Sequence, residues 1–77
     1  MKSAREMFKK LGYVRLNIFP LSIDYVKQIN LKDAKIISFT LKSKSYYAMD
    51  RNIAMGIDMP TFKAIQKQLE ELGWLDD

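Results

Sequence analysis

The segment Phe-Lys-Lys-Leu-Gly-Tyr-Val at residues 8–14 decides the fold, because its pattern returns in Leu-Glu-Glu-Leu-Gly-Trp-Leu at residues 69–75. Each segment is typical of a helix that ends at a glycine in the left-handed conformation and is followed by an aromatic residue. The spacing predicts that Tyr13 folds back on Phe8, five positions earlier, and that Trp74 does the same in the second segment. The chain should therefore carry a helix near each end.

Residues typical of a helix N-terminus precede both predicted helices. Ser3 and Glu6 have the spacing of a capping box, so the first helix should begin at Ala4. Asp58 can cap the amide of Thr61 at the start of the last helix. Four apolar residues recur at helical spacing and predict the buried face of that last helix: Phe62, Ile65, Leu69 and Leu72.

Between the helices the apolar residues alternate with a period of two, which indicates strands. Strands are predicted at residues 13–18, 23–29, 35–41 and 46–49, with a turn at 19–22 and a connector at 50–56. The sequence predicts an α+β fold in a single small domain, residues 1–77. An antiparallel meander of three to four strands should carry both helices on one sheet face.

Alternation also predicts which side chains each face of the sheet presents. The face under the helices is expected to offer Val14, Leu16, Ile18, Ile37, Phe39 and Leu41. The open face is expected to show Tyr13, Arg15, Asn17, Ile36, Ser38, Thr40 and either Tyr46 or Tyr47.

Composition excludes several kinds of chemistry. The 77 residues include neither histidine nor cysteine, so a catalytic triad and a zinc site are excluded. Asp24, Asp33 and Asp50 are dispersed acids without the pairing that acid–base catalysis needs. We therefore expect no enzyme activity, no cofactor and no metal. The absence of a long apolar run or signal-peptide pattern predicts a cytoplasmic protein.

The charge is unevenly distributed along the chain. Residues 1–56 hold eleven Lys and Arg against four Asp and Glu, whereas residues 57–77 hold two lysines against five acids. A basic body with an acidic last helix can attract nucleic acid or a second copy of the chain, and it is also an ordinary solvated surface.

Two kinds of binding remain open. Protein–protein contact, with an unknown partner or in a homodimer, is favoured by the small core and a half-apolar open sheet face. The alternative is single-stranded nucleic acid, which open sheets with aromatic and basic residues bind by stacking. The candidate binding face for that alternative consists of Tyr13, Arg15, Lys35, Lys42 and Tyr46.

Both ends of the chain resemble a known group of sequences. The matching residues are Ala4-Arg5-Glu6-Met7-Phe8 with Leu11-Gly12-Tyr13, and Ile57-Asp58-Met59 with Lys63-Ala64-Ile65, Gln68 and Glu71-Leu72-Gly73-Trp74. This pattern is similar to small uncharacterised proteins in phages, prophages and other mobile regions of Gram-positive bacteria. The resemblance implies a helix, a sheet and a final helix in a bacterial cytoplasm, and it implies no activity and no site.

Overall fold

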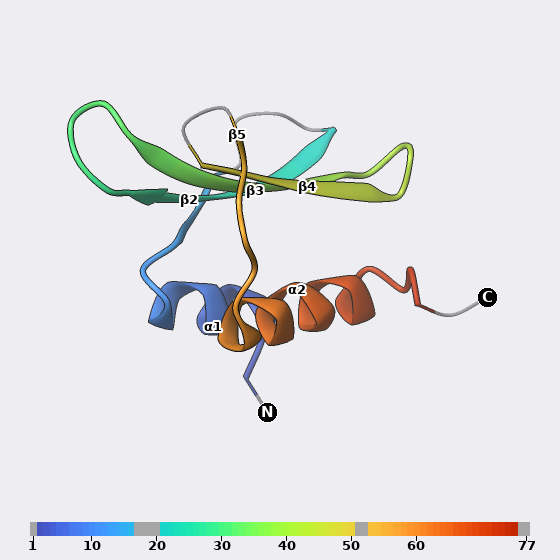
Figure 1. Ribbon diagram of the computed structural model, residues 1–77. Coiled ribbons are helices and arrows are strands. Elements are labelled where there is room, and N and C mark those ends of the chain that lie inside the picture. Colours follow the sequence, from blue (N-terminus) through green and yellow to red (C-terminus); the bar gives the residue numbers. More distant parts are fainter. Residues whose placement is uncertain (1, 17–20, 51–52, 76–77) are drawn as a thin grey trace.

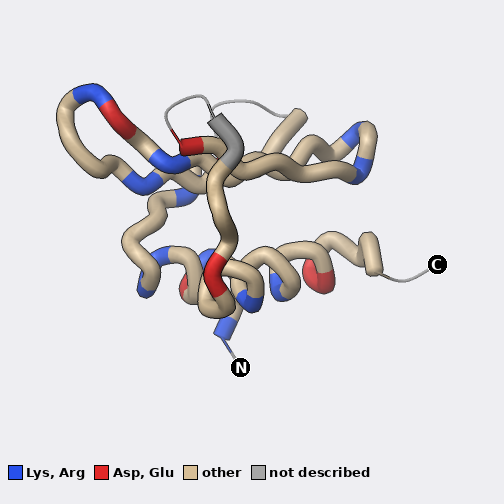
Figure 2. The backbone as a smooth tube through the Cα atoms, viewed as in Figure 1, with Lys and Arg blue, Asp and Glu red and all other residues tan. Residues whose placement is uncertain are grey.

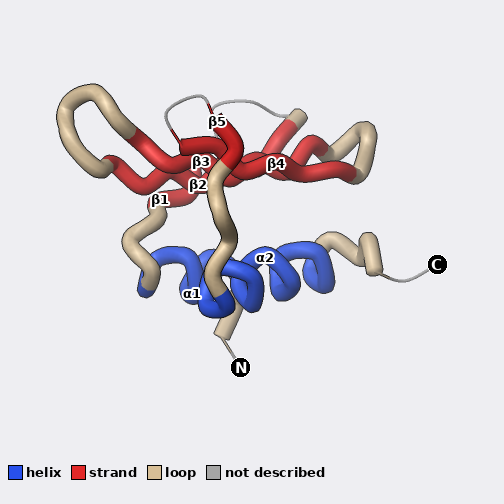
Figure 3. Tube along the Cα trace, in the orientation of Figure 1, coloured by secondary structure: helices blue, strands red, loops and turns tan. Residues whose placement is uncertain are grey.

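The computed structural model describes residues 2–16, 21–50 and 53–75, which form a sheet with two helices on one of its faces (Figure 1). In chain order the elements are α1 (Ala4–Lys10), β1 (Val14–Leu16), β2 (Ser22–Gln28), β3 (Ala34–Thr40), β4 (Ser45–Asp50), β5 (Ile53–Ala54) and α2 (Met59–Glu71). The two layers are plain in Figure 3. They confirm the predicted α+β class, with both helices on the same side of the sheet.

All neighbouring strands are antiparallel, and their order in the sheet, β1-β2-β3-β4-β5, follows the chain. The short strand β5 lies in the stretch predicted as a connector, and it adds one strand to the expected meander. Part of the predicted turn, with Asn17 and Ile18 before it, lies outside the described residues. In the described part of the chain, neither helix has the length and apolar character needed to cross a membrane.

The first helix begins and ends as its sequence predicts. The Glu6 amide donates to Ser3 Oγ over 3.1 Å, and the Ser3 amide donates to the Glu6 carboxylate over 3.4 Å. Gly12 has a φ of 96°, and the Tyr13 amide donates to the Phe8 carbonyl over 2.9 Å. The rings of Phe8 and Tyr13 meet edge to face, 5.6 Å apart, so the aromatic residue after the glycine does fold back.

The last helix has the same kind of ends. Asp58 Oδ1 accepts the Thr61 amide over 2.9 Å, and the hydrogen bonds from Thr61 lower the pKa of the Asp58 carboxyl below its usual range. At the other end Gly73 has a φ of 74°, and the Trp74 amide donates to the Leu69 carbonyl over 3.1 Å. Both predicted stop signals are therefore confirmed.

The predicted buried face of α2 is wrong at Phe62, whose side chain is 44% exposed. Ile65 is buried as predicted, and Leu69 and Leu72 pack partly against the core. The buried stripe of the helix includes polar residues and is rotated about the helix axis by less than one residue position from the predicted stripe. Its buried members are Thr61, Ala64, Ile65 and Gln68.

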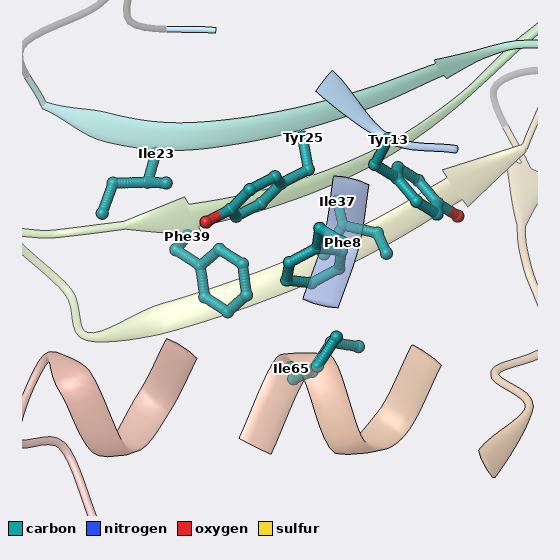
Figure 4. Close-up of a cluster of buried hydrophobic side chains, with 8 residues drawn as sticks. Phe8, Tyr13, Ile23, Tyr25, Ile37, Phe39 and Ile65 are labelled. Carbon is teal, nitrogen blue, oxygen red and sulfur yellow. The ribbon is translucent and has the colours of Figure 1, made fainter. Parts of the chain in front are cut away.

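Aromatic rings fill the space between the layers (Figure 4). Phe8 of α1 is fully buried and stacks on Tyr25 of β2 with ring centroids 4.0 Å apart. Phe39 of β3 lies edge-on to both rings, at 6.4 Å from Phe8 and 6.1 Å from Tyr25. Ile37 and Ile65 complete the buried centre from opposite layers. Ile37 and Phe39 are therefore core residues, as predicted.

The facing predicted for β1 is wrong. Val14 is 63% exposed, and Leu16 lines the sheet face that lies away from the helices. The reason is Tyr13, which is only 4% exposed because it packs on Phe8. Since side chains alternate along a strand, a buried Tyr13 places Arg15 on the helix side of the sheet. The same alternation places Val14 and Leu16 on the opposite face.

We expect Gly12→Ala and Gly73→Ala each to lower the free energy of unfolding by about 1 kcal/mol or more, because alanine is strained at positive φ. A Cβ at Gly73 would meet no atom within 4 Å, so that variant isolates the backbone cost. At Gly12 the Lys27 side chain would also have to move. Gly56→Ala is the matched control, because its Cβ would also stand in open space. Unchanged urea midpoints for both test variants would contradict this account of the helix ends.

Candidate interaction surface

The sheet face away from the helices carries a hollow of about 360 Å³, which we call the outer groove. It crosses the central strands β2 and β3 and reaches β1 and β4. Its lining alternates along each strand with the residues of the core. The lining residues are Leu16, Ser22, Asp24, Val26, Ile36, Ser38, Thr40 and Tyr47.

A carboxylate lies among these residues and is held in place by two hydroxyls. Ser22 Oγ donates to Asp24 Oδ2 over 3.0 Å, and Ser38 Oγ donates to Asp24 Oδ1 over 2.5 Å. Ser38 is buried although it belongs to the outer face, so its hydroxyl is fixed by the sheet around it. The carboxylate is therefore an oriented acceptor with lone pairs left for a further donor.

Aliphatic and aromatic side chains surround the carboxylate. Val26 and Ile36 are direct partners across β2 and β3, and Leu16 is the partner of Asp24 across β1 and β2. Tyr47 contributes a half-exposed ring from β4. Among the described residues that line the groove, Asp24 is the one charged residue, and none is a lysine or arginine.

The structure does not bring the five residues of the predicted binding face together. Tyr13 is in the core, where burial raises the pKa of its hydroxyl above 10.0 and the Asp58 and Asp50 carboxylates raise it further. Arg15 is the direct partner of the core residue Tyr25, so it lies on the helix side of the sheet. Lys35 lies on the same side, because it is two positions before the core residue Ile37 in β3. Expecting Tyr13 on the open face was wrong, because its contact with Phe8 takes it inside.

The two remaining residues of that set also lie apart. Tyr46 is opposite Phe39, with ring centroids 5.7 Å apart, so it belongs to the helix side at the edge of the core. Lys42 is exposed in the turn between β3 and β4. The alternative left open between the two tyrosines is resolved in favour of Tyr47, which faces outward.

Sequence reasoning missed the groove as a site, although part of its signal was present. Ile36, Ser38 and Thr40 were expected on the open face and do lie there. In residues 23–29, Ile23 and Tyr25 alternate with Asp24 and Val26, which would have placed the carboxylate on that face. What the sequence could not supply is the register that sets Asp24 beside Ser38.

The described residues hold no cluster of three or more His, Cys, Asp or Glu side chains that could bind a metal ion. Comparisons with protein-family models, curated proteins and solved structures gave no match to this chain. The site is therefore interpreted from its own geometry.

Proposed function

We propose that this chain is a non-enzymatic interaction module that binds a partner protein through the outer groove. The observation that carries the proposal is the groove itself, in which the described lining residues surround one oriented carboxylate with aliphatic and aromatic side chains and include no lysine or arginine. A protein segment that places aliphatic side chains on Val26 and Ile36 and a donor group on Asp24 would complement it.

The same composition argues against nucleic acid on this face. A phosphate backbone is bound mainly by Lys and Arg, whereas the charged residue in the part of the lining that the structure describes is Asp24. We also propose that the protein is of phage or prophage type, as the resemblance of its sequence implies, and that it is located in the cytoplasm. In that setting the partner is another protein of the bacterial cytoplasm.

Ile36→Asp tests the proposal because it removes an aliphatic side chain from the groove and adds a second negative charge there. Leu31→Asp is the matched control, since Leu31 is fully exposed in the loop between β2 and β3 and outside the groove lining. Tagged wild type and both variants are used to capture proteins from a nuclease-treated bacterial lysate. The captured partner is then purified and its affinity is measured.

The expected result is a partner that binds wild type and Leu31→Asp equally and Ile36→Asp at least about tenfold more weakly, with circular dichroism unchanged. Equal binding by all three proteins would refute the groove as the site. Binding of a single-stranded oligonucleotide at physiological salt that is lost in Tyr47→Ala would establish the nucleic-acid alternative instead.

A further inference from the structure

Three lysines line a second hollow, which lies beside the two helices. It has a volume of about 440 Å³ and lies where the end of α1 meets the start of α2. Its apolar lining comes from Met7, Leu11 and Pro60, and its charged lining from Lys2, Lys10 and Lys63. We call it the lysine hollow.

Charge in the lysine hollow is of one sign. Lys2, Lys10 and Lys63 line it, and the other described residues of its lining include no Asp or Glu. The neighbouring Lys2 ammonium lowers the pKa of Lys10 below its ordinary value of 10.5, which is the direction expected for two close cations. A bound anionic group would offset this repulsion.

The nearby acids of the described chain already have structural partners. Glu6 closes the capping box of α1, and Asp58 caps α2. Glu71 accepts the Ala4 amide over 2.8 Å, and Glu70 lies 3.8 Å from Lys67. Each of these four carboxylates is therefore engaged within its own chain.

We propose that the lysine hollow binds an acidic peptide segment of a partner protein, with carboxylates on the three lysines and an aliphatic side chain on the apolar floor. This site is separate from the outer groove and does not rest on the function proposed for it. Lysine ammonium groups pair singly with carboxylates, and Met7, Leu11 and Pro60 suit an aliphatic group.

The lining of the lysine hollow also argues against single-stranded nucleic acid as its ligand. Bases of a single-stranded nucleic acid gain much of their affinity by stacking on aromatic rings, and none of the described residues that line this hollow is aromatic. An aliphatic side chain next to a carboxylate meets both requirements of the site.

The test uses a fluorescent capped peptide in which glutamates flank a leucine, with anisotropy measured at physiological salt. Lys10→Gln and Lys63→Gln should each weaken binding about tenfold, because each removes one charge-assisted contact. Lys42→Gln is the matched control, since it makes the same charge change in the turn between β3 and β4, outside the hollow. A peptide with serine for leucine should bind several-fold more weakly.

Equal weakening by Lys42→Gln, or equal binding of the serine peptide, would overturn the proposal by showing attraction to net charge alone. Tighter binding of a single-stranded oligonucleotide or of anionic lipid vesicles, with the same dependence on Lys10 and Lys63, would also overturn it. Ile36→Asp should leave peptide binding unchanged, which separates a failure here from a failure of the outer groove.

Discussion

Phe8→Ala should cost about 3–5 kcal/mol of unfolding free energy, which is most of the stability of a domain this small. Phe8 is fully buried, stacks on Tyr25 at 4.0 Å and meets Tyr13 and Phe39 edge to face. Alanine would leave a cavity among three rings, which come from β2, from β3 and from Tyr13 immediately before β1. Urea unfolding followed by circular dichroism measures the loss.

Phe62→Ala is the matched control, because it removes the same side chain from the exposed side of α2. Its cost should stay below about 1 kcal/mol. If Phe8→Ala does not fold at all, Phe8→Leu supplies a measurable intermediate, since leucine keeps part of the buried volume. Equal losses for Phe8→Leu and Phe62→Leu would contradict the position of Phe8 at the centre of the core.

Tyr25→Phe is expected to lower the free energy of unfolding by about 1–3 kcal/mol, although it removes one oxygen atom only. The Tyr25 hydroxyl donates to Gln68 Oε1 over 2.5 Å, in a bond between the sheet and α2 that is buried at both ends. Phenylalanine would leave the Gln68 carbonyl oxygen without this donor. Thermal or urea unfolding of the variant measures the cost.

The double variant Tyr25→Phe with Gln68→Leu makes this prediction specific to the hydrogen bond. Replacing both partners by apolar groups should recover much of the loss, because neither leaves a buried polar atom unpaired. Additive losses in the two single variants would indicate that packing, and not the bond between the two side chains, sets the cost.

The pH dependence of stability supplies a second readout of the same hydroxyl. Burial raises the pKa of Tyr25 above its ordinary value of 10.0, and the nearby Arg15 opposes the shift. The unfolded chain therefore releases this proton at lower pH than the folded protein does. The stability that this group contributes is complete below pH 10.0 and is lost as the pH rises from there through the raised pKa. The free energy of unfolding of Tyr25→Phe should therefore fall less steeply with pH in this range than that of wild type.

The helix ends could be predicted because their signals are local. A capping box, an N-cap and a glycine followed by an aromatic residue each act within six residues, and the structure places Ser3, Asp58, Gly12 and Gly73 in those roles. The alternation in β3 is equally clear. Ile37 and Phe39 are buried in the core, whereas Ile36, Ser38 and Thr40 line the outer groove on the other face of the sheet.

The error in β1 came from two expectations that cannot both hold. Tyr13 was expected to pack on Phe8 and also to lie on the open face, yet a side chain has one direction. Giving priority to the helix stop would have fixed the facing of β1, because every residue after Tyr13 alternates from it. The aliphatic Val14 and Leu16 were the misleading signal, since an apolar outer groove also uses such residues.

The groove and the exposed Phe62 depend on information that the sequence does not carry locally. Asp24 meets Ser38 only through the register of β2 with β3, fourteen positions apart along the chain. Gln68 can be buried because the Tyr25 hydroxyl supplies a hydrogen-bond partner for its side chain. With the Gln68 side of α2 turned toward the core, Phe62 is left on the exposed side of the helix. A buried glutamine is unexpected until that partner is known.

The agreement between strand order and chain order has a consequence for how quickly the protein folds. Each strand pairs with its immediate predecessor, so every pairing in the sheet closes a short loop at a small entropic cost. The exception is the docking of α2 on α1, where the hydrogen bond from Ala4 to Glu71 joins residues 67 positions apart. We expect the meander to assemble by local steps, with closure of the helix layer as the slow one that completes the core.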